Sequence, residues 1–296
     1  MWIPITIAAA TFQILRTSRQ HRLRELLSPI GAGYVRYLYG APLALLLAGT
    51  WFGALDHPEP EVPARFWPII ATAGVAQIAA TIALLRSFQA RGFAVGTVYS
   101  KTEVIQVAIV GALVLGEPLR PLGWVAIVAC MVGVAWLASN GDLGAILRRA
   151  GDPAARLGVI AGGLFGVAAV GIRGASGTLG DAPAFDRALL TLTAMLAIQT
   201  VVNGLYLLAV DRPELARTFA SWRAALPIGV LSLGGSTGWA VAVTLENAAK
   251  VRTLGQVELL LAFAISHRTL GELHTRHELL ASALVLVGVA GVVAFG

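Results

Sequence analysis

Residues 94–115 read AVGTVYSKTEVIQVAIVGALVL, an apolar stretch that carries Lys101 and Glu103 in its interior. A membrane-spanning helix needs about 20 predominantly apolar residues, because it must cross about 30 Å of hydrocarbon at 1.5 Å per residue. This stretch is long enough for one crossing, and Glu103 lies roughly 15 Å along it. The segment therefore predicts a membrane helix with a carboxylate close to the middle of the bilayer.

The same arrangement recurs 155 residues later in the chain. In an ungapped register over residues 67–135, Glu103 aligns with Glu258, and Gly116-Glu117 aligns with Gly271-Glu272. Charged residues are rare inside apolar runs, so these matches carry more weight than coincidences of alanine and valine. They indicate an internal duplication.

The composition places the whole chain in a membrane. Hydrophobic residues make up 57 % of the sequence and charged residues only 13 %, whereas a soluble domain is typically about 25 % charged. This excludes a water-soluble enzyme, a disordered chain and a nucleic-acid-binding module, although the formal net charge is +6. The arginines fall between apolar stretches, where they set the orientation of the helices. The single cysteine, Cys130, rules out an intrachain disulfide.

Ten segments approach the length of a membrane span. They are residues 2–15, 31–52, 68–85, 94–115, 122–138, 157–172, 188–210, 224–245, 253–270 and 279–295.

The predicted fold is an all-α integral membrane protein with ten transmembrane helices in two inverted five-helix repeats. Residues 1–140 form the first repeat, residues 141–156 the connecting loop and residues 157–296 the second repeat. Five helices per repeat is an odd number, so the second repeat enters the membrane in the opposite sense. Many secondary transporters have this architecture and bind substrate where the repeats meet.

Several glycines recur at four-residue spacing, among them Gly158, Gly162 and Gly166, and also Gly234 and Gly238. Small residues at this spacing let two helix backbones approach closely. We interpret these glycines as packing positions, with sliding surfaces for alternating access as the alternative.

The chain resembles the drug/metabolite transporter superfamily, specifically the ten-helix EamA-like permeases. The resemblance rests on the two five-helix repeats, on Arg36 early in the second helix, and on Gly116-Glu117 and Gly271-Glu272 at the end of each fourth helix. It implies secondary transport, usually export, of metabolites or toxic compounds across the bacterial inner membrane. It also implies a central cavity lined by the first four helices of each repeat, with the fifth helices peripheral.

Glu103 is the leading candidate for ion coupling. An ionised carboxylate at the depth of Glu103 is costly unless it is paired, protonated or facing water. A carboxylate that exchanges a proton is what a proton-coupled site needs, and duplication at Glu258 favours this function. The alternative is a permanently paired, structural glutamate that pins two helices together.

Lys101, Tyr99 and Gln106 are the polar neighbours of Glu103. Lys101 and Glu103 are two residues apart and point to opposite sides of a helix, so each needs another partner. Tyr99 and Gln106 share the face of Glu103, and the resulting polar stripe is suited to binding an ammonium group or relaying a proton. Lys101 and Lys250 are the only lysines in the chain.

The second half contributes Glu258 and Gln256 to the candidate substrate or coupling residues. Lys250 and Arg252 precede them at the start of a helix, and we interpret both as interfacial anchors.

Three further candidates lie in other helices. Arg36 either reaches the membrane interface with its long side chain, or closes the cavity at one end, or binds a substrate carboxylate with two hydrogen bonds. Gln77 and Trp239, in the mirrored third helices, are candidate cavity-lining residues.

We expect no metal, no cofactor and no enzymatic centre. His267, His274 and His277 lack the spacing of a metal-binding motif. No nucleotide-binding loop is present, so the energy must come from an ion or solute gradient. The expected partners are a small-molecule substrate, membrane lipids and, as coupling ion, protons; nucleic acid is not among them, and a homodimer is left open. An uncoupled facilitator or exchanger is the main alternative function, and an intramembrane enzyme is a remote one.

The distribution of positive charge predicts the topology. Loops that follow odd-numbered helices hold fourteen arginines, against six arginines and lysines in the other loops. Because positively charged loops stay in the cytoplasm, reporter fusions should place the loop of Arg16, Arg19, Arg22 and Arg24 in the cytoplasm and both termini outside. A periplasmic signal from a reporter in this loop would reverse the predicted orientation.

Overall fold

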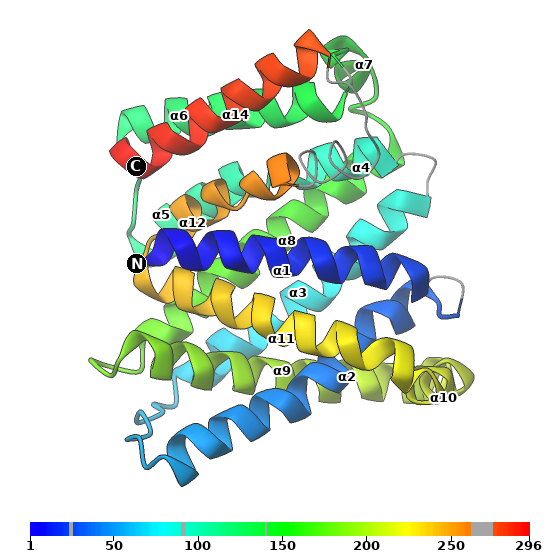
Figure 1. Cartoon of the computed structure of the whole chain (residues 1–296), viewed down its shortest axis with the longest axis vertical. Coiled ribbons are helices and arrows are strands. Elements are labelled where there is room, and N and C mark those ends of the chain that lie inside the picture. Colours follow the sequence, from blue (N-terminus) through cyan, green and yellow to red (C-terminus); the bar gives the residue numbers. More distant parts are fainter. Residues whose placement is uncertain (24–25, 90–92, 140, 262–274) are drawn as a thin grey trace. The chain divides into compact units, whose positions relative to one another are not determined.

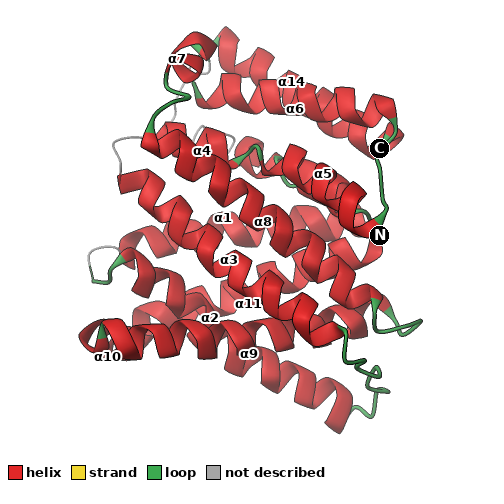
Figure 2. Cartoon of the chain, turned by 180° about the vertical axis from the view of Figure 1, so that it is seen from behind, coloured by secondary structure: helices red, strands yellow, loops and turns green. Residues whose placement is uncertain are grey.

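The computed structural model describes residues 1–23, 26–89, 93–139, 141–261 and 275–296. Every regular element in these ranges is a helix, and no strand occurs among them (Figure 2). The elements are α1 (Trp2–Arg22), α2 (Pro29–Ala48), η2 (Gly49–Ala54), α3 (Phe66–Gln89), α4 (Phe93–Ser100), α5 (Glu103–Leu115), α6 (Pro121–Ala138), α7 (Leu143–Arg148), α8 (Pro153–Gly177), α9 (Ala184–Val210), α10 (Arg212–Ala220), α11 (Trp222–Leu245), α12 (Ala248–Leu254) and α14 (Arg276–Phe295) (Figure 1).

Eight spans in the described residues are long and apolar enough to cross a membrane. They correspond to eight of the ten predicted segments. The first predicted segment, residues 2–15, lies in α1, which is helical but is not one of the eight. The ninth, residues 253–270, runs into residues outside the description. The chain is therefore a multi-pass helical membrane protein, and the count of ten stays a prediction.

The helices fall into two compact units. Unit 1 contains Met1–Ile78 and Gly171–Glu246, and unit 2 contains Ala79–Val170 and Asn247–Gly296. Each unit draws on both halves of the sequence, and the unit boundaries fall inside α3 and α8. These units group segments by contact, so the predicted division into repeats at residues 140 and 157 stays a prediction.

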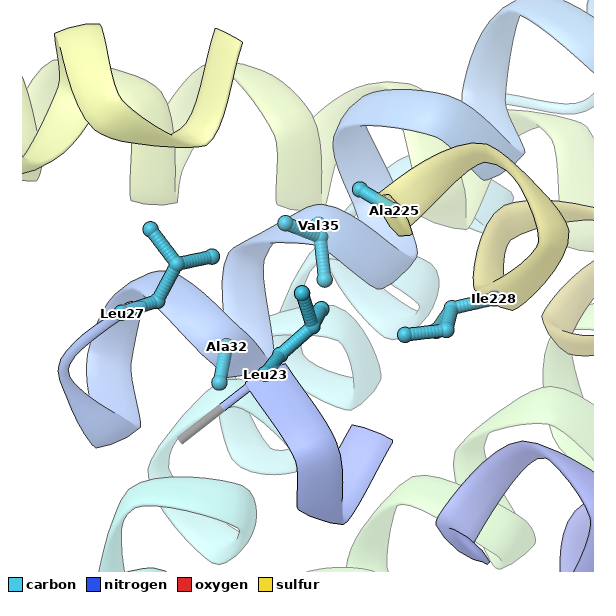
Figure 3. Close-up of a cluster of buried hydrophobic side chains, with 6 residues drawn as sticks. All are labelled: Leu23, Leu27, Ala32, Val35, Ala225 and Ile228. Atoms are coloured by element: carbon cyan, nitrogen blue, oxygen red, sulfur yellow. The ribbon is translucent and has the colours of Figure 1, made fainter. Parts of the chain in front are cut away.

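Unit 1 is built on the packing of α11 against α1, α2 and α9. Where α1 ends and α2 begins, a buried apolar cluster joins them to α11 (Figure 3). Its members are Leu23, Leu27, Ala32, Val35, Ala225 and Ile228. Further along, the interpretation of Gly238 as a packing position is confirmed, because an added Cβ would lie 2.8 Å from the Cβ of Ala9.

The short helix α10 fastens the start of α2 within unit 1. Ser28 caps α2, with its hydroxyl accepting a hydrogen bond from the Gly31 N–H at 3.2 Å. The fully buried Glu214 of α10 accepts a hydrogen bond from the Ser28 N–H at 2.6 Å. A carboxylate is favourable at this position, because the first N–H groups of a helix have no partner within it. A Cβ on Gly31 would overlap the Glu214 carboxylate, so a larger residue there would have to displace this side chain.

Unit 2 contains the close packing of α6 on α14, the last helices of the two predicted repeats (Figure 1). Glycines on both helices make the approach possible. A Cβ on Gly133 would lie 2.8 Å from the backbone nitrogen of Val285, and a Cβ on Gly288 would overlap the backbone of Cys130. The Cys130 thiol is buried at this contact.

Replacing Gly288 by alanine should destabilise unit 2, because the added methyl group must push α6 and α14 apart. Overpacking of this kind typically costs about 1–3 kcal/mol. The measurement is thermal unfolding in detergent followed by a thiol-reactive dye, because Cys130 is the only cysteine and its exposure reports opening of this contact. Gly53→Ala is the control, since a Cβ there meets nothing within 4 Å. Equal unfolding temperatures for both variants would contradict the packing argument.

Candidate functional site

Two interrupted helices face each other in unit 2. In the first half, α4 ends at Ser100 and α5 begins at Glu103, with a turn at Lys101 and Thr102 between them. In the second half, α12 ends at Leu254 and helical residues resume at Val257 after a turn. The 155-residue offset places the two turns within one residue of each other in the aligned sequence. The uninterrupted span predicted for residues 94–115 is thus a helix with a break.

Backbone hydrogen bonds are present at both turns. The Ile105 N–H donates to the Thr102 carbonyl at 3.1 Å, and the Glu258 N–H donates to the Gly255 carbonyl at 3.0 Å. These bonds link residues three apart, as in a 3₁₀ turn, in place of the four-residue spacing of an α-helix. The Thr102 hydroxyl also donates to the Tyr99 carbonyl at 2.6 Å. The turns therefore satisfy part of the backbone that the break releases, as irregular backbone at membrane depth requires.

Glu103 forms an ion pair with Arg252. The Arg252 Nε donates to Glu103 Oε1 at 2.5 Å, and a second guanidinium nitrogen contacts the same oxygen. The Glu103 side chain is 8 % exposed and the Arg252 side chain 18 % exposed. Our interpretation of Arg252 as an interfacial anchor is wrong, because its guanidinium is held inside the unit by the carboxylate that we expected to need a partner.

Glu258 forms the matching ion pair with Lys101. These side chains are 13 % and 15 % exposed. The prediction that Lys101 and Glu103 do not neutralise one another is confirmed, since each pairs with the opposite half of the sequence. The partners occur in reverse order along the chain: Lys101 contacts Glu258, whereas Glu103 contacts Arg252. The two interrupted segments thus pass each other in opposite directions, and Figure 1 shows α12 beside α5.

Tyr99 and Gln106 lie against α8. Gln106 donates from Nε2 to the Thr102 hydroxyl at 2.8 Å and to the Val159 carbonyl at 3.2 Å. Tyr99 packs on a buried pair of alanines at the start of α8, Ala154 and Ala155.

The glycines of α8 create the space for this contact. An added Cβ on Gly158 would lie 2.8 Å from the Gly96 carbonyl oxygen, and one on Gly162 would lie 2.8 Å from the Ser100 carbonyl oxygen. The interpretation of these glycines as packing positions is confirmed. They bring α8 against the first helix interruption.

Gln256 lies in the second turn and is buried. Its Nε2 donates to the Arg252 carbonyl at 3.2 Å. Its Oε1 has no hydrogen-bond partner in the part of the chain that the structure describes. Gln256 therefore leaves a free acceptor beside the ion pairs.

The three remaining predicted residues belong to unit 1. Gln77 accepts a hydrogen bond from the buried Gln199 at 2.8 Å, and Trp239 donates to Gln13 of α1 at 3.1 Å. Arg36 is buried on α2, and whether its side chain lies near the membrane interface stays a prediction. These three residues belong to unit 1 and the Glu103–Arg252 pair to unit 2, and whether the three line a substrate path stays a prediction.

Sequence reasoning missed Gln199 as well as Arg252. Gln199 donates to both Gln77 and the Gly74 carbonyl and links α9 to α3. The available sequence signal for Gln199 was a glutamine within the apolar segment 188–210. For Arg252, the signal was its place directly before a predicted apolar segment, residues 253–270, that contains a carboxylate. The duplication gave no help, because Arg252 aligns with Thr97.

No group of three potential metal ligands occurs among the residues that the structure covers. His267 and His274 lie outside the described residues.

Comparison with known proteins gives three findings. Residues 1–139 match the model of the EamA-like transporter family. A protein of Sinorhizobium sp, described as an uncharacterized transporter in the cobO 3′ region, is 31 % identical over 96 residues. That stretch covers 32 % of this chain and 66 % of the relative, a little less than two thirds of its length. A solved structure, described only as "Crystal structure of protein", is similar with a TM-score of 0.74 over 99 % of this chain and 97 % of that chain.

The fold and the apolar spans define a multi-pass membrane protein. Residues 1–139 are similar to the EamA-like transporter family, and this match supports the predicted resemblance for that part of the chain. The solved structure is 13 % identical and shows the fold alone.

Removing one partner of the Glu103–Arg252 pair should be strongly destabilising, while removing both should cost much less. A single Glu103→Gln or Arg252→Gln change leaves a mostly buried charge unpaired, at a cost of about 3–5 kcal/mol. The free energy of unfolding in detergent, measured for both single variants and the double variant, gives the coupling energy directly.

The control cycle uses the surface pair of Asp142 and Arg148, which are 59 % and 72 % exposed. Neutralising either should change stability by about 1 kcal/mol or less. A Glu103–Arg252 coupling energy no larger than that of the surface pair would show that the buried pair is not a stabilising contact.

Proposed function

We propose that the protein is a secondary transporter that exports a small metabolite or amphipathic compound across the bacterial inner membrane by alternating access, driven by protons that Glu103 takes up and releases. The family match over residues 1–139 supports the transporter class. Export, proton coupling and location go beyond that match and are the content of the proposal.

The observation that carries the proposal is the crossed pair of salt bridges at two interrupted helices. Discontinuous membrane helices in transporters mark the places where substrates and coupling ions bind. Here the interruptions carry two carboxylates and two cations, each carboxylate bonded to the opposite half of the sequence. A pair of this kind is an element with two states, closed and open, that an ion or solute can bias.

A proton is the simplest agent that opens one of these pairs. With all four groups ionised the cluster is neutral, since Glu103 and Glu258 balance Arg252 and Lys101. Protonation of Glu103 removes its negative charge and leaves Arg252 without a counterion. Arginine cannot restore neutrality by losing its own proton. The guanidinium must then find another acceptor, so the contact between the two interrupted segments is weakened.

The rival function is an uncoupled facilitator or exchanger, and one observation favours it. Glu103 already has a charged partner and two contacts to it. If this pair stays closed throughout transport, Glu103 is a structural lock and the solute moves only down its own gradient.

A reconstituted transport assay separates the two functions. The probe is the compound from a metabolite panel that most raises the melting temperature of the purified protein, because a ligand of the folded state stabilises it by mass action. In liposomes, a pH gradient of one unit supplies about 1.4 kcal/mol per proton, enough for about tenfold accumulation of a neutral probe. The Glu103→Gln variant should lose this accumulation and keep exchange of labelled for unlabelled probe, because exchange needs only the shuttling step.

Two further variants make the result decisive. Glu103→Gln with Arg252→Gln removes the unpaired charge, so loss of coupling in the double variant is not an effect of instability. Asp142→Asn removes an exposed carboxylate and should behave as the wild type. Gradient-driven accumulation by the double variant would refute the coupling role of Glu103. If the wild type exchanges the probe and a pH gradient never drives its accumulation, the facilitator is correct; a protein that moves none of the compounds that stabilise it is not a transporter of that class.

A further inference from the structure

Arg36 of α2 is a buried guanidinium that has no counterion among the residues that the structure describes. Its residue is only 9 % exposed, and its Nε has no hydrogen-bond partner in the described part of the chain. Within those same residues, no carboxylate forms an ion pair with it. The contact that it makes is with the ring of the next residue, Tyr37, whose centroid lies 5.6 Å from Cζ. A cation over an aromatic face gains some stabilisation, but this contact satisfies none of its N–H groups.

Unit 1 shows how a structural arginine is accommodated. Arg173, near the end of α8, donates from Nη1 to the carbonyl oxygens of Val243 and Glu246, both at 2.7 Å. The Arg173 guanidinium thus binds the backbone carbonyls at the C-terminal end of α11, so its charge has hydrogen-bond acceptors within the chain. Arg36 has no equivalent set of acceptors in the described part of the chain, so the same structural role does not account for it.

A second polar group beside Arg36 also lacks a partner. The Tyr37 residue is 1 % exposed, and its hydroxyl has no hydrogen-bond partner among the described residues. Buried polar groups in proteins are almost always hydrogen-bonded. Two adjacent residues of one helix thus offer donors with no acceptor from the described chain.

Contacts between α2 and α9 show where Arg36 and Tyr37 lie in unit 1. An added Cβ on Gly204 would lie 2.6 Å from the Tyr34 hydroxyl, and one on Gly40 would lie 3.9 Å from the Leu196 side chain. Residues 34–40 of α2 therefore run alongside residues 196–204 of α9, in the opposite direction. This places Arg36 at the level of Gln199 and Asn203, whose side-chain oxygens are also buried without a partner in the described chain.

We propose that Arg36 binds the carboxylate of the transported solute. The inference rests on the proposed transport function and names the chemistry that one of its sites recognises. A guanidinium at membrane depth stays charged, and a lone buried charge is expensive unless it is neutralised. One guanidinium matches one negative charge, and its planar fork fits the two oxygens of a carboxylate. The Tyr37 hydroxyl supplies a further donor to an anion at this place.

The test measures binding of defined probes to the purified wild-type protein. Acetate, lactate and benzoate are each compared with the amide of the same acid, at matched concentration and ionic strength, by the shift in melting temperature. At least one carboxylate should raise the melting temperature while its amide does not. Sodium chloride and phosphate are run in parallel, and an equal shift with chloride would mean that the site takes any small anion and would overturn the proposal.

Variants then assign the effect to Arg36. Arg36→Gln should weaken binding of the effective carboxylate by tenfold or more, and Arg36→Lys should retain part of it, since it keeps the charge and loses the fork. Tyr37→Phe should weaken it less than Arg36→Gln. Arg148→Gln, which removes an exposed arginine in α7, should bind as the wild type.

The wild-type comparison does not depend on whether a variant folds. If no carboxylate stabilises the wild-type protein more than its amide, or if Arg36→Gln binds the carboxylate unchanged, the proposal is wrong. Failure here is distinguishable from failure of the transport function. A protein that exchanges a neutral or cationic probe, and does so equally well with Arg36→Gln, is a transporter whose substrate is not held by Arg36.

Discussion

The pairing of charges inside an apolar environment is the constraint on which unit 2 depends. Glu103, Glu258, Lys101 and Arg252 would each be costly in hydrocarbon alone. Their reciprocal contacts make a neutral cluster, and each contact joins residues of the first half of the chain to residues of the second. The breaks in the two helices serve this pairing. They allow Lys101 and Glu103, which are only two residues apart, to contact partners that lie six residues apart.

The two units treat buried charge differently. Unit 2 neutralises its inner charges within the chain. Unit 1 pairs the buried Glu214 with Arg217 and with the N-terminus of α2, and it satisfies Arg173 with backbone carbonyls. It nevertheless buries Arg36 without an acceptor from the described chain. A closed charge cluster suits a contact that forms and breaks, whereas an unpaired cation suits capture of a ligand. The proposed coupling and the proposed recognition therefore rest on separate observations.

The sequence was a good guide to the apolar spans and a partial guide to the site. Length and hydrophobicity located eight of the spans, because crossing a bilayer imposes both on the residues directly. The duplicated glutamates pointed to the paired segments, since an unexplained carboxylate in an apolar run is rare. The break at Lys101 and Thr102 was not foreseen, because neither residue is a glycine or proline that would signal it. Arg252 was misread for a different reason: its partner is 149 residues away, and pairing at that range is decided by packing between helices.

Because lysine is scarce in this chain, Lys101 can report chemically on the first helix interruption, in which it lies. The chain has two lysines, so an amine-reactive reagent meets, besides the terminal amine, only Lys101 and Lys250. An ammonium group held by a carboxylate reacts slowly, because acylation requires the free, deprotonated amine. The rate at which Lys101 is acylated, read by mass spectrometry against Lys250 in the same molecule, therefore records how often the bond to Glu258 is broken in the unmodified protein.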